Sequence, residues 1–113
     1  MLKLLENLEL AGITFIRDYI QFLFDGPVLN TYTLPQIKID NDIISKFQSG
    51  YYDMLCSLIG KRIIYANEDK KENKIVIRFE ENISLTVSLR LDDRQCAEAV
   101  MLQMEQGMEW NIW

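Results

Sequence analysis

Residues 74–90, KIVIRFEENISLTVSLR, carry the clearest structural pattern in the sequence. Apolar and polar side chains alternate on both sides of residues 80–82, which is the two-residue period of half-buried strands joined in a hairpin. A two-residue loop would place Ile77 opposite a threonine, whereas a three-residue loop places it opposite Leu85 and keeps the apolar positions on one face. Asn82 tolerates the left-handed backbone that the last position of such a loop requires. The sequence therefore predicts the three-residue loop.

Length and charge limit the classes of protein to be considered. The chain has 113 residues, 49% hydrophobic and 26% charged, which suits one globular domain spanning residues 1–113. Its net charge of −5 disfavours direct binding to nucleic acid or anionic lipid and favours a basic protein as partner. Glu6 and Glu9 interrupt the N-terminal apolar segment, and no apolar run approaches the length of a membrane span. We therefore expect a cytoplasmic protein that does not contact the membrane.

The other segments predict short helices and further hairpins around the central strand pair. Apolar spacing predicts helices over residues 2–10 and 50–59. Residues 13–24 are too long for one strand and rich in β-branched and aromatic side chains, so two short strands with a turn near Arg17 are expected. Hairpin turns are predicted at residues 25–27, 80–82 and 105–107. The fold class is α+β, with a predominantly antiparallel sheet built from three hairpins and two short helices. The expected core consists of Phe22, Phe24, Leu55, Ile59, Ile75, Ile77, Phe79, Leu85, Val87, Leu102 and Trp110.

Two stretches of the chain follow the same order of helix, strand and hairpin, which suggests an internal repeat. A shift of 55 positions aligns the apolar residues of the first hairpin with those of the second. In this alignment Asn30 takes the position of Leu85, so Phe22 is expected opposite Asn30. The match is imperfect, because Pro27 cannot adopt the left-handed backbone expected at the equivalent Asn82. In the C-terminal hairpin the predicted register sets Leu102 opposite Trp110. The predicted units are residues 2–34 and 52–90, followed by the hairpin over residues 97–113.

The sequence holds few groups suited to catalysis or metal binding. It has no histidine, the commonest general base and metal ligand. Cys56 and Cys96 lack CxxC spacing, so we interpret both as free, buried thiols. Paired carboxylates such as Asp40 and Asp42 lack the glycine and final glutamate of a calcium loop. We therefore expect no enzyme activity, no cofactor and no metal.

Acidic residues are concentrated in the loops that flank the central hairpin. They are either a solvated, solubilising surface or a surface that steers and binds a basic protein. Trp113 at the C-terminus either packs against a neighbouring helix or serves as an aromatic contact. The candidate partner-binding residues are Glu68, Asp69, Glu72, Glu80, Glu81, Asp92, Asp93 and Trp113.

The layout of residues 52–113 resembles that of small bacterial proteins, some of which are similar to immunity proteins of polymorphic and contact-dependent toxin systems. The resemblance lies in the hydrophobic spacing of LCSLIGKRI, KIVIRFEENISLTVSLR, AEAVMLQ and the closing WNIW. It implies a cytosolic inhibitor that binds a cognate toxin domain, often a basic nuclease, and needs no catalytic group. The alternative is a non-catalytic structural or self-associating domain, whose exposed sheet edge or aromatic end makes a homodimer.

Overall fold

The central hairpin forms in the predicted register. In this computed structural model, strand β7 (Lys74–Phe79) pairs with β8 (Ile83–Ser88), and Ile77 lies opposite Leu85. Both side chains are buried, so the apolar positions of the two strands share one face. The prediction of a three-residue loop is therefore confirmed.

The turn between β7 and β8 differs from the expected type in one detail. Asn82 is left-handed, as predicted, with φ 60°, but Glu81 is left-handed too, with φ 67°. A type I turn followed by a bulge would have only its last residue in that region. The Asn82 side chain donates a hydrogen bond from Nδ2 to Asp40 Oδ1 at 3.3 Å, which ties this turn to the neighbouring hairpin.

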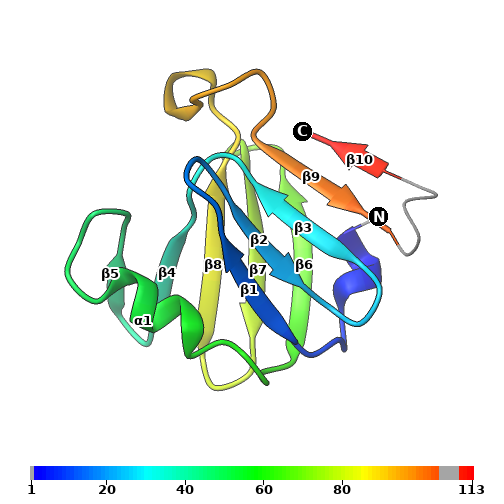
Figure 1. Cartoon of the computed structure of the whole chain (residues 1–113), viewed down its shortest axis with the longest axis vertical. Coiled ribbons are helices and arrows are strands. Elements are labelled where there is room, and N and C mark those ends of the chain that lie inside the picture. The colour runs from blue at the N-terminus through cyan, green and yellow to red at the C-terminus, as the bar shows by residue number, and fades with distance from the viewer. Residues whose placement is uncertain (1, 105–109) are drawn as a thin grey trace.

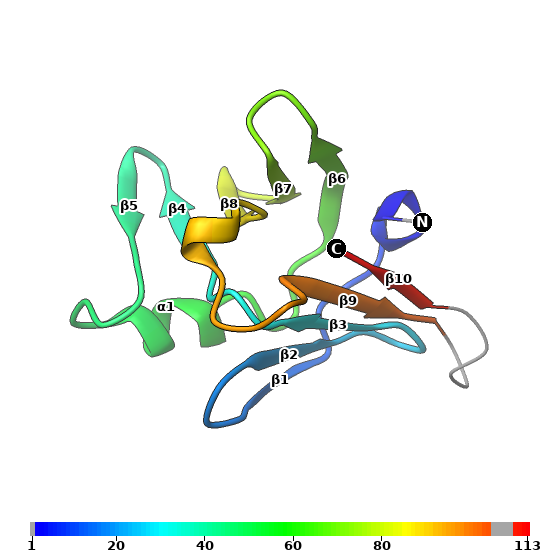
Figure 2. The same ribbon diagram turned by 90° about the horizontal axis from the view of Figure 1, so that it is seen from above.

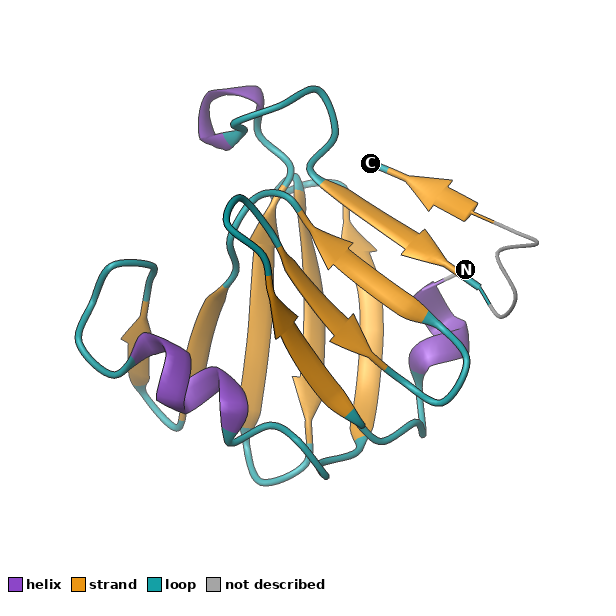
Figure 3. Cartoon of the chain, in the orientation of Figure 1, coloured by secondary structure: helices purple, strands orange, loops and turns teal. Residues whose placement is uncertain are grey.

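The structure describes residues 2–104 and 110–113, and within these ranges ten strands form two antiparallel sheets that face each other (Figures 1 and 2). Sheet 1 has the order β1–β2–β3–β9–β10, and sheet 2 has the order β5–β4–β8–β7–β6. The predominantly antiparallel architecture was predicted, but two sheets replace the single sheet of three hairpins, and little of the chain is helical (Figure 3). The other strands are β1 (Gly12–Phe15), β2 (Ile20–Leu23), β3 (Val28–Thr31), β4 (Gln36–Ile39), β5 (Asp42–Ile44), β6 (Ile63–Asp69), β9 (Val100–Gln103) and β10 (Trp110–Ile112). The helical segments are η1 (Leu2–Leu5), α1 (Tyr51–Cys56) and η2 (Leu91–Asp93).

The two halves of the chain exchange hairpins between the sheets. Strands β1, β2 and β3 form a meander in sheet 1, and β6, β7 and β8 form one in sheet 2. The hairpin β4–β5 follows the first meander but pairs with β8, while β9–β10 follows the second meander and pairs with β3. Each meander is therefore completed by a hairpin from the other half, so neither half completes its sheet alone. The internal repeat itself stays a prediction.

The predicted helix over residues 2–10 is wrong beyond its first turn. Only η1 (Leu2–Leu5) is helical, and Asn7 then adopts a left-handed backbone with φ 74°. The next residues run extended beside the segment that leads into β6, where the Leu10 N–H donates to the Lys61 carbonyl at 3.0 Å. These long-range bonds satisfy the backbone without a helix, which the local apolar spacing could not indicate.

The predicted helix over residues 50–59 is shorter than expected. Helix α1 covers Tyr51–Cys56, and the chain then leaves the helical path in a series of turns. Its two buried residues face the core together with Leu58, whereas Tyr52 and Ile59 are 50% and 44% exposed. Ile59 was therefore wrongly assigned to the core, because the helical period does not extend to it.

The first predicted hairpin pairs one residue away from the register that the repeat requires. Phe22 lies opposite Leu29 rather than Asn30. The reason is a turn of two central residues: Pro27 O accepts a hydrogen bond at 3.0 Å from the N–H of the residue three positions earlier, and Gly26 provides the positive φ of 111°.

The C-terminal hairpin is also one residue out of the predicted register. Leu102 lies opposite Asn111 rather than Trp110. Because side chains alternate across a strand, this shift turns Trp110 and Ile112 to the outer face, where each is 56% exposed. Trp110 was therefore wrongly assigned to the core. The predicted turn at residues 105–107 lies outside the described residues.

Most of the predicted core lies in the layer between the sheets. Its members come from both halves of the chain and are joined there by residues of α1 and η1. The predicted core residues that are buried are Phe22, Phe24, Leu55, Ile75, Ile77, Phe79, Leu85, Val87 and Leu102.

The two cysteines are free thiols, as predicted, but both are exposed rather than buried. Cys56 ends α1, and Cys96 lies in the loop after η2, where its Sγ approaches the Glu98 carbonyl at 3.2 Å. No helix in the described ranges is long and apolar enough to cross a membrane.

Candidate functional site

The outer face of sheet 2 carries polar side chains in rows that cross its strands. The register places Lys38 of β4, Ser84 of β8 and Arg78 of β7 beside one another. Tyr65 of β6 continues the row, and its ring centre lies 4.8 Å from the Arg78 guanidinium. The residues next to these along each strand, such as Leu85, point into the core. The same alternation that builds the core therefore builds this polar surface.

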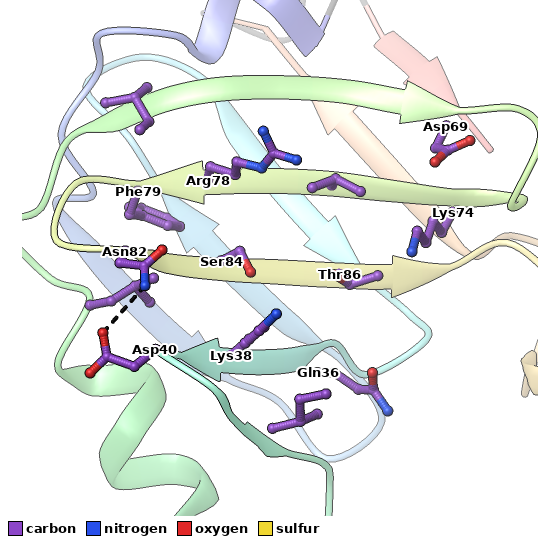
Figure 4. Close-up of a pocket in the computed structure, with 14 residues that line it drawn as sticks. Gln36, Lys38, Asp40, Asp69, Lys74, Arg78, Phe79, Asn82, Ser84 and Thr86 are labelled. Atoms are coloured by element: carbon purple, nitrogen blue, oxygen red, sulfur yellow. Dashed lines mark hydrogen bonds between the residues drawn. The ribbon is translucent and has the colours of Figure 1, made fainter.

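These rows form the floor of a groove of about 640 Å³ (Figure 4). Its volume matches a small-molecule site, but charged, amide and hydroxyl side chains make up most of its lining. Three cations, Lys38, Lys74 and Arg78, stand over the middle strands with Ser84 and Thr86 between them. Such a polar, open surface is better suited to contacting a macromolecule than to enclosing an apolar ligand.

An acidic residue lies near each end of the groove. Asp40 lies at one end, where it accepts the hydrogen bond from Asn82, and Asp69 lies at the other, opposite Lys74 in the strand pairing (Figure 4). The Asp69 side chain also accepts a hydrogen bond from the backbone N–H of Glu72 at 3.0 Å, which fixes the turn after β6. The groove thus presents Lys38 and Arg78 in its middle and a carboxylate near each end, with Lys74 beside Asp69.

A second hollow of about 560 Å³ adjoins the groove at the Asp69 end and shares Lys74 with it. It brings Glu72 of the β6–β7 loop together with Asp92 and Asp93 of η2, and it is also lined by four cations, Lys46, Lys74, Arg90 and Arg94. The Asp93 carboxylate accepts a hydrogen bond from the Ser88 hydroxyl, which holds η2 against the end of β8. Four of the predicted acidic residues are therefore gathered at this end of sheet 2.

Glu80 and Glu81 lie at the opposite end, in the turn between β7 and β8. Glu80 accepts a hydrogen bond from the Arg62 N–H at 3.1 Å, and Lys61 Nζ pairs with Glu81 Oε2 at 2.7 Å. Six residues of β7 at about 3.3 Å each separate the two ends by about 20 Å. The acidic residues around the hairpin thus form two separate groups.

Glu68 and Trp113 contact each other away from the groove. Glu68 is paired with Ile75 in the sheet, so its side chain is on the inner face. Its Oε1 accepts a hydrogen bond from Trp113 Nε1 at 2.9 Å, and the Trp113 N–H donates to the Val100 carbonyl at 2.9 Å. Trp113 is therefore part of the packing: it lies partly buried against the core and is bonded to β6.

The remaining titratable groups do not add chemistry to the groove. In the described part of the chain, no group of three or more His, Cys, Asp or Glu side chains could hold a metal ion. Burial raises the pKa of Tyr51 and of Tyr32, and the hydrogen bond from the Ala66 N–H lowers the pKa of Glu6. All of these groups lie outside the groove lining. What the groove offers a ligand is fixed charge and hydrogen-bonding groups.

The sequence prediction missed the cations of the groove as a group. The alternation in residues 74–90 already placed Arg78, Ser84 and Thr86 on the face away from the core. Lys38 joins the groove only because β4 pairs with β8, and no local sequence pattern predicts this long-range contact. Comparisons of the chain with family models, with curated proteins and with solved structures gave no match.

Proposed function

We propose that the protein is a non-catalytic binding protein of the immunity type, which neutralises a cognate bacterial toxin by direct protein contact. The observation that carries the proposal is the groove on the outer face of sheet 2, with cations in its middle and carboxylates at its ends. Mixed charge held on rigid strands favours a partner with the complementary pattern and disfavours others. The hydrophobic spacing of residues 52–113 resembles that of immunity proteins and agrees with this role.

Glu72 and Asp92 are the acidic residues best placed to meet a basic toxin surface. Both are exposed, and their carboxylates make no hydrogen bond or ion pair within the described residues. Three other carboxylates already make hydrogen bonds or ion pairs within the chain, which a partner would have to share or replace: Glu80, Glu81 and Asp93. Free carboxylates at a loop keep their full charge for steering a cationic surface.

Lys38 and Arg78 supply the opposite charge from the groove floor. They lie in one row across β4, β8 and β7, so their spacing is set by the sheet rather than by flexible loops. Acidic groups of the toxin would pair with them while its basic groups meet Glu72 and Asp92. This two-sign arrangement fixes one docking orientation, because a rotated partner would bring like charges together.

Survival of cells that express the candidate toxin tests the proposal. The candidate is the product of the reading frame adjacent to that of this protein. The native protein is expected to protect, and the double variant Glu72→Lys/Asp92→Lys is expected to lose protection at equal accumulation. The matched control, Asp18→Lys/Asp25→Lys, reverses two exposed acids in the turns of sheet 1 and should protect like the native protein.

One result would overturn the immunity function, and another would overturn the contact surface assigned to it. If the native protein does not protect against the adjacent gene product, the immunity function is wrong. If both double variants protect as well as the native protein, the function stands but the acidic end of the groove is not the contact surface.

A further inference from the structure

Strand β1 is an edge strand of sheet 1, and half of its backbone groups face away from the sheet. The ladder with β2 continues one residue past β1, where the Ile16 N–H donates to the Tyr19 carbonyl at 2.9 Å. Hydrogen-bonded pairs alternate along an antiparallel ladder, so every second residue before Ile16 bonds to β2. The N–H and C=O groups of Ile13 and Phe15 therefore point outward from the sheet.

The edge of sheet 2 at β6 is covered, whereas the edge of sheet 1 at β1 is not. On β6 the Ile63 N–H donates to the Leu8 carbonyl at 2.9 Å, and the Ala66 N–H donates to the Glu6 carboxylate at 3.1 Å. Among the described residues, no hydrogen bond reaches the outward groups of β1. Figure 2 shows β1 as the outermost strand of sheet 1, and no described segment runs along its outer side. An uncovered strand edge can pair with another extended chain.

An apolar hollow of about 440 Å³ lies at one end of this edge. The rings of Phe15 and Tyr52 meet there, with their centres 5.2 Å apart, and the two residues are 41% and 50% exposed. We call it the edge hollow, and it is lined by Phe15, Ile16, Arg17, Ile20, Leu34 and Tyr52. A strand paired with β1 would carry every second side chain on the same face as Phe15, so one of them can enter the edge hollow.

Arg17 adds a positive charge to the edge hollow. It is exposed, and within the described part of the chain it forms no ion pair, even with the adjacent Asp18. The other residues of the edge hollow are uncharged. A free cation beside an apolar hollow favours a partner that brings a carboxylate to this point. The site therefore suits an extended segment with an apolar and an acidic side chain on one face.

A second copy of the chain suits this edge less well. Two antiparallel β1 strands that use both outward residues of each copy would set Arg17 of one copy opposite Ala11 of the other. The next carboxylate along that face, Glu9, is already paired with Arg62 at 2.9 Å. Two copies that each carry a net charge of −5 also repel each other. The complementary partner is therefore a different protein.

We propose that β1 is the docking edge for an extended segment of another protein. The segment adds a strand to sheet 1, fills the edge hollow with an apolar side chain and pairs a carboxylate with Arg17. Backbone hydrogen bonds at Ile13 and Phe15 provide affinity, and the edge hollow and Arg17 determine which sequences bind. The edge and the groove lie on different sheets, so this proposal does not depend on the immunity function.

Amide hydrogen exchange measured by NMR tests the proposal. The N–H groups of Ile13 and Phe15 should exchange rapidly in the free protein and become protected when a segment binds. The probe is the peptide Thr-Glu-Thr-Phe-Thr-Glu-Thr. Its two glutamates share a face with the phenylalanine, so either strand direction brings one of them towards Arg17.

Two further versions of the peptide carry N-methyl groups on alternate residues, one on the odd and one on the even positions. A strand bonds to one neighbour only through every second residue. One version should therefore protect the two amides, and the other should not.

Charge exchange at Arg17 tests the chosen partner chemistry. Arg17→Glu should weaken binding of the glutamate peptide about tenfold at low salt, and less at high salt. The same variant should bind a peptide with lysine in place of glutamate more tightly than the native chain does. Arg90→Glu is the matched control, because it makes the same change at an exposed arginine after β8, and both affinities should stay at their native values.

Four results would overturn the proposal. The two amides could stay in rapid exchange up to the solubility limit of the unmodified peptide, or the two methylated peptides could protect them equally. Arg17→Glu could bind both charged peptides as the native chain does, although its spectrum shows a native fold. Protection that rises with protein concentration alone would show that a second copy covers the edge.

Discussion

Replacing Tyr51 by phenylalanine should destabilise the protein through a single buried hydrogen bond. Tyr51 is 1% exposed, and its hydroxyl donates to the Pro35 carbonyl at 2.6 Å, linking α1 to the start of β4. The substitution removes that bond and leaves a buried carbonyl without its donor, which costs about 1–3 kcal/mol. For a chain of this size each kcal/mol lowers Tm by about 4 °C, so a decrease of about 4–12 °C is expected.

The same substitution should alter stability at alkaline pH. Burial raises the pKa of Tyr51 above its usual value of about 10, and the charge of Tyr52 adds to this effect. The folded state therefore holds this proton more tightly than the unfolded state. The stability that follows is fully present below about pH 10 and is lost as the pH rises through the folded pKa, by up to about 1.4 kcal/mol per pH unit. Tyr51→Phe should remove this part of the alkaline slope.

Urea unfolding and thermal melts between about pH 7 and pH 11 measure both effects. Tyr52→Phe is the matched control: it removes the hydroxyl of the adjacent, half-exposed tyrosine, and its stability should stay within about 0.5 kcal/mol of the native value. If Tyr51→Phe matches the native protein in Tm and in alkaline slope, the buried hydroxyl does not stabilise the link between α1 and β4.

Three other substitutions test the fold. Ile77→Ala removes a fully buried side chain opposite Leu85 and should lower the free energy of unfolding by about 2–5 kcal/mol in urea titrations; a loss below about 0.5 kcal/mol would show that the hairpin core is not packed as described. Asn73 has a left-handed backbone with φ 55°, so Asn73→Ala should lower the free energy of unfolding by about 1 kcal/mol, whereas Asn73→Gly should be neutral or stabilising. Equal Tm values for the two variants would contradict this backbone geometry. The hydrogen bond from the Ala66 N–H lowers the pKa of Glu6. The stability that this bond adds is present above the unfolded pKa of Glu6 and is lost as the pH falls through the folded pKa. Glu6→Gln should therefore flatten the decrease of stability between about pH 5 and pH 3, and an unchanged acid slope would exclude this role.

Local sequence patterns predicted the structure correctly where the residues that determine it are close together in the sequence. The alternation around residues 80–82 determined the register of β7 and β8, because only one loop length keeps Ile77 and Leu85 on the same face. The turn near Arg17 was predictable for the same reason, since residues 13–24 cannot form a single strand of ordinary length.

Predictions failed where a distant segment decides the outcome. The segment after η1 is extended because it bonds to the chain before β6, and the C-terminal hairpin takes its register where β9 pairs with β3. A shift of one residue there moved Trp110 from the core to the surface. The groove has the same origin, because Lys38 joins Arg78 only through the pairing of β4 with β8. The spacing of residues along one sequence does not indicate which distant strands pair.

The rate at which the protein associates with the purified toxin tests most directly whether the acidic end of the groove is the contact surface. Stopped-flow measurements at low and high salt would compare the native protein with Glu72→Lys/Asp92→Lys and with the control Asp18→Lys/Asp25→Lys. If this end of the groove is the contact surface, the first variant should associate about tenfold more slowly at low salt and show a weaker salt dependence, because two steering charges are reversed. The control should match the native protein. An unchanged rate constant and an unchanged salt dependence in Glu72→Lys/Asp92→Lys would show that the toxin does not contact this end of the groove.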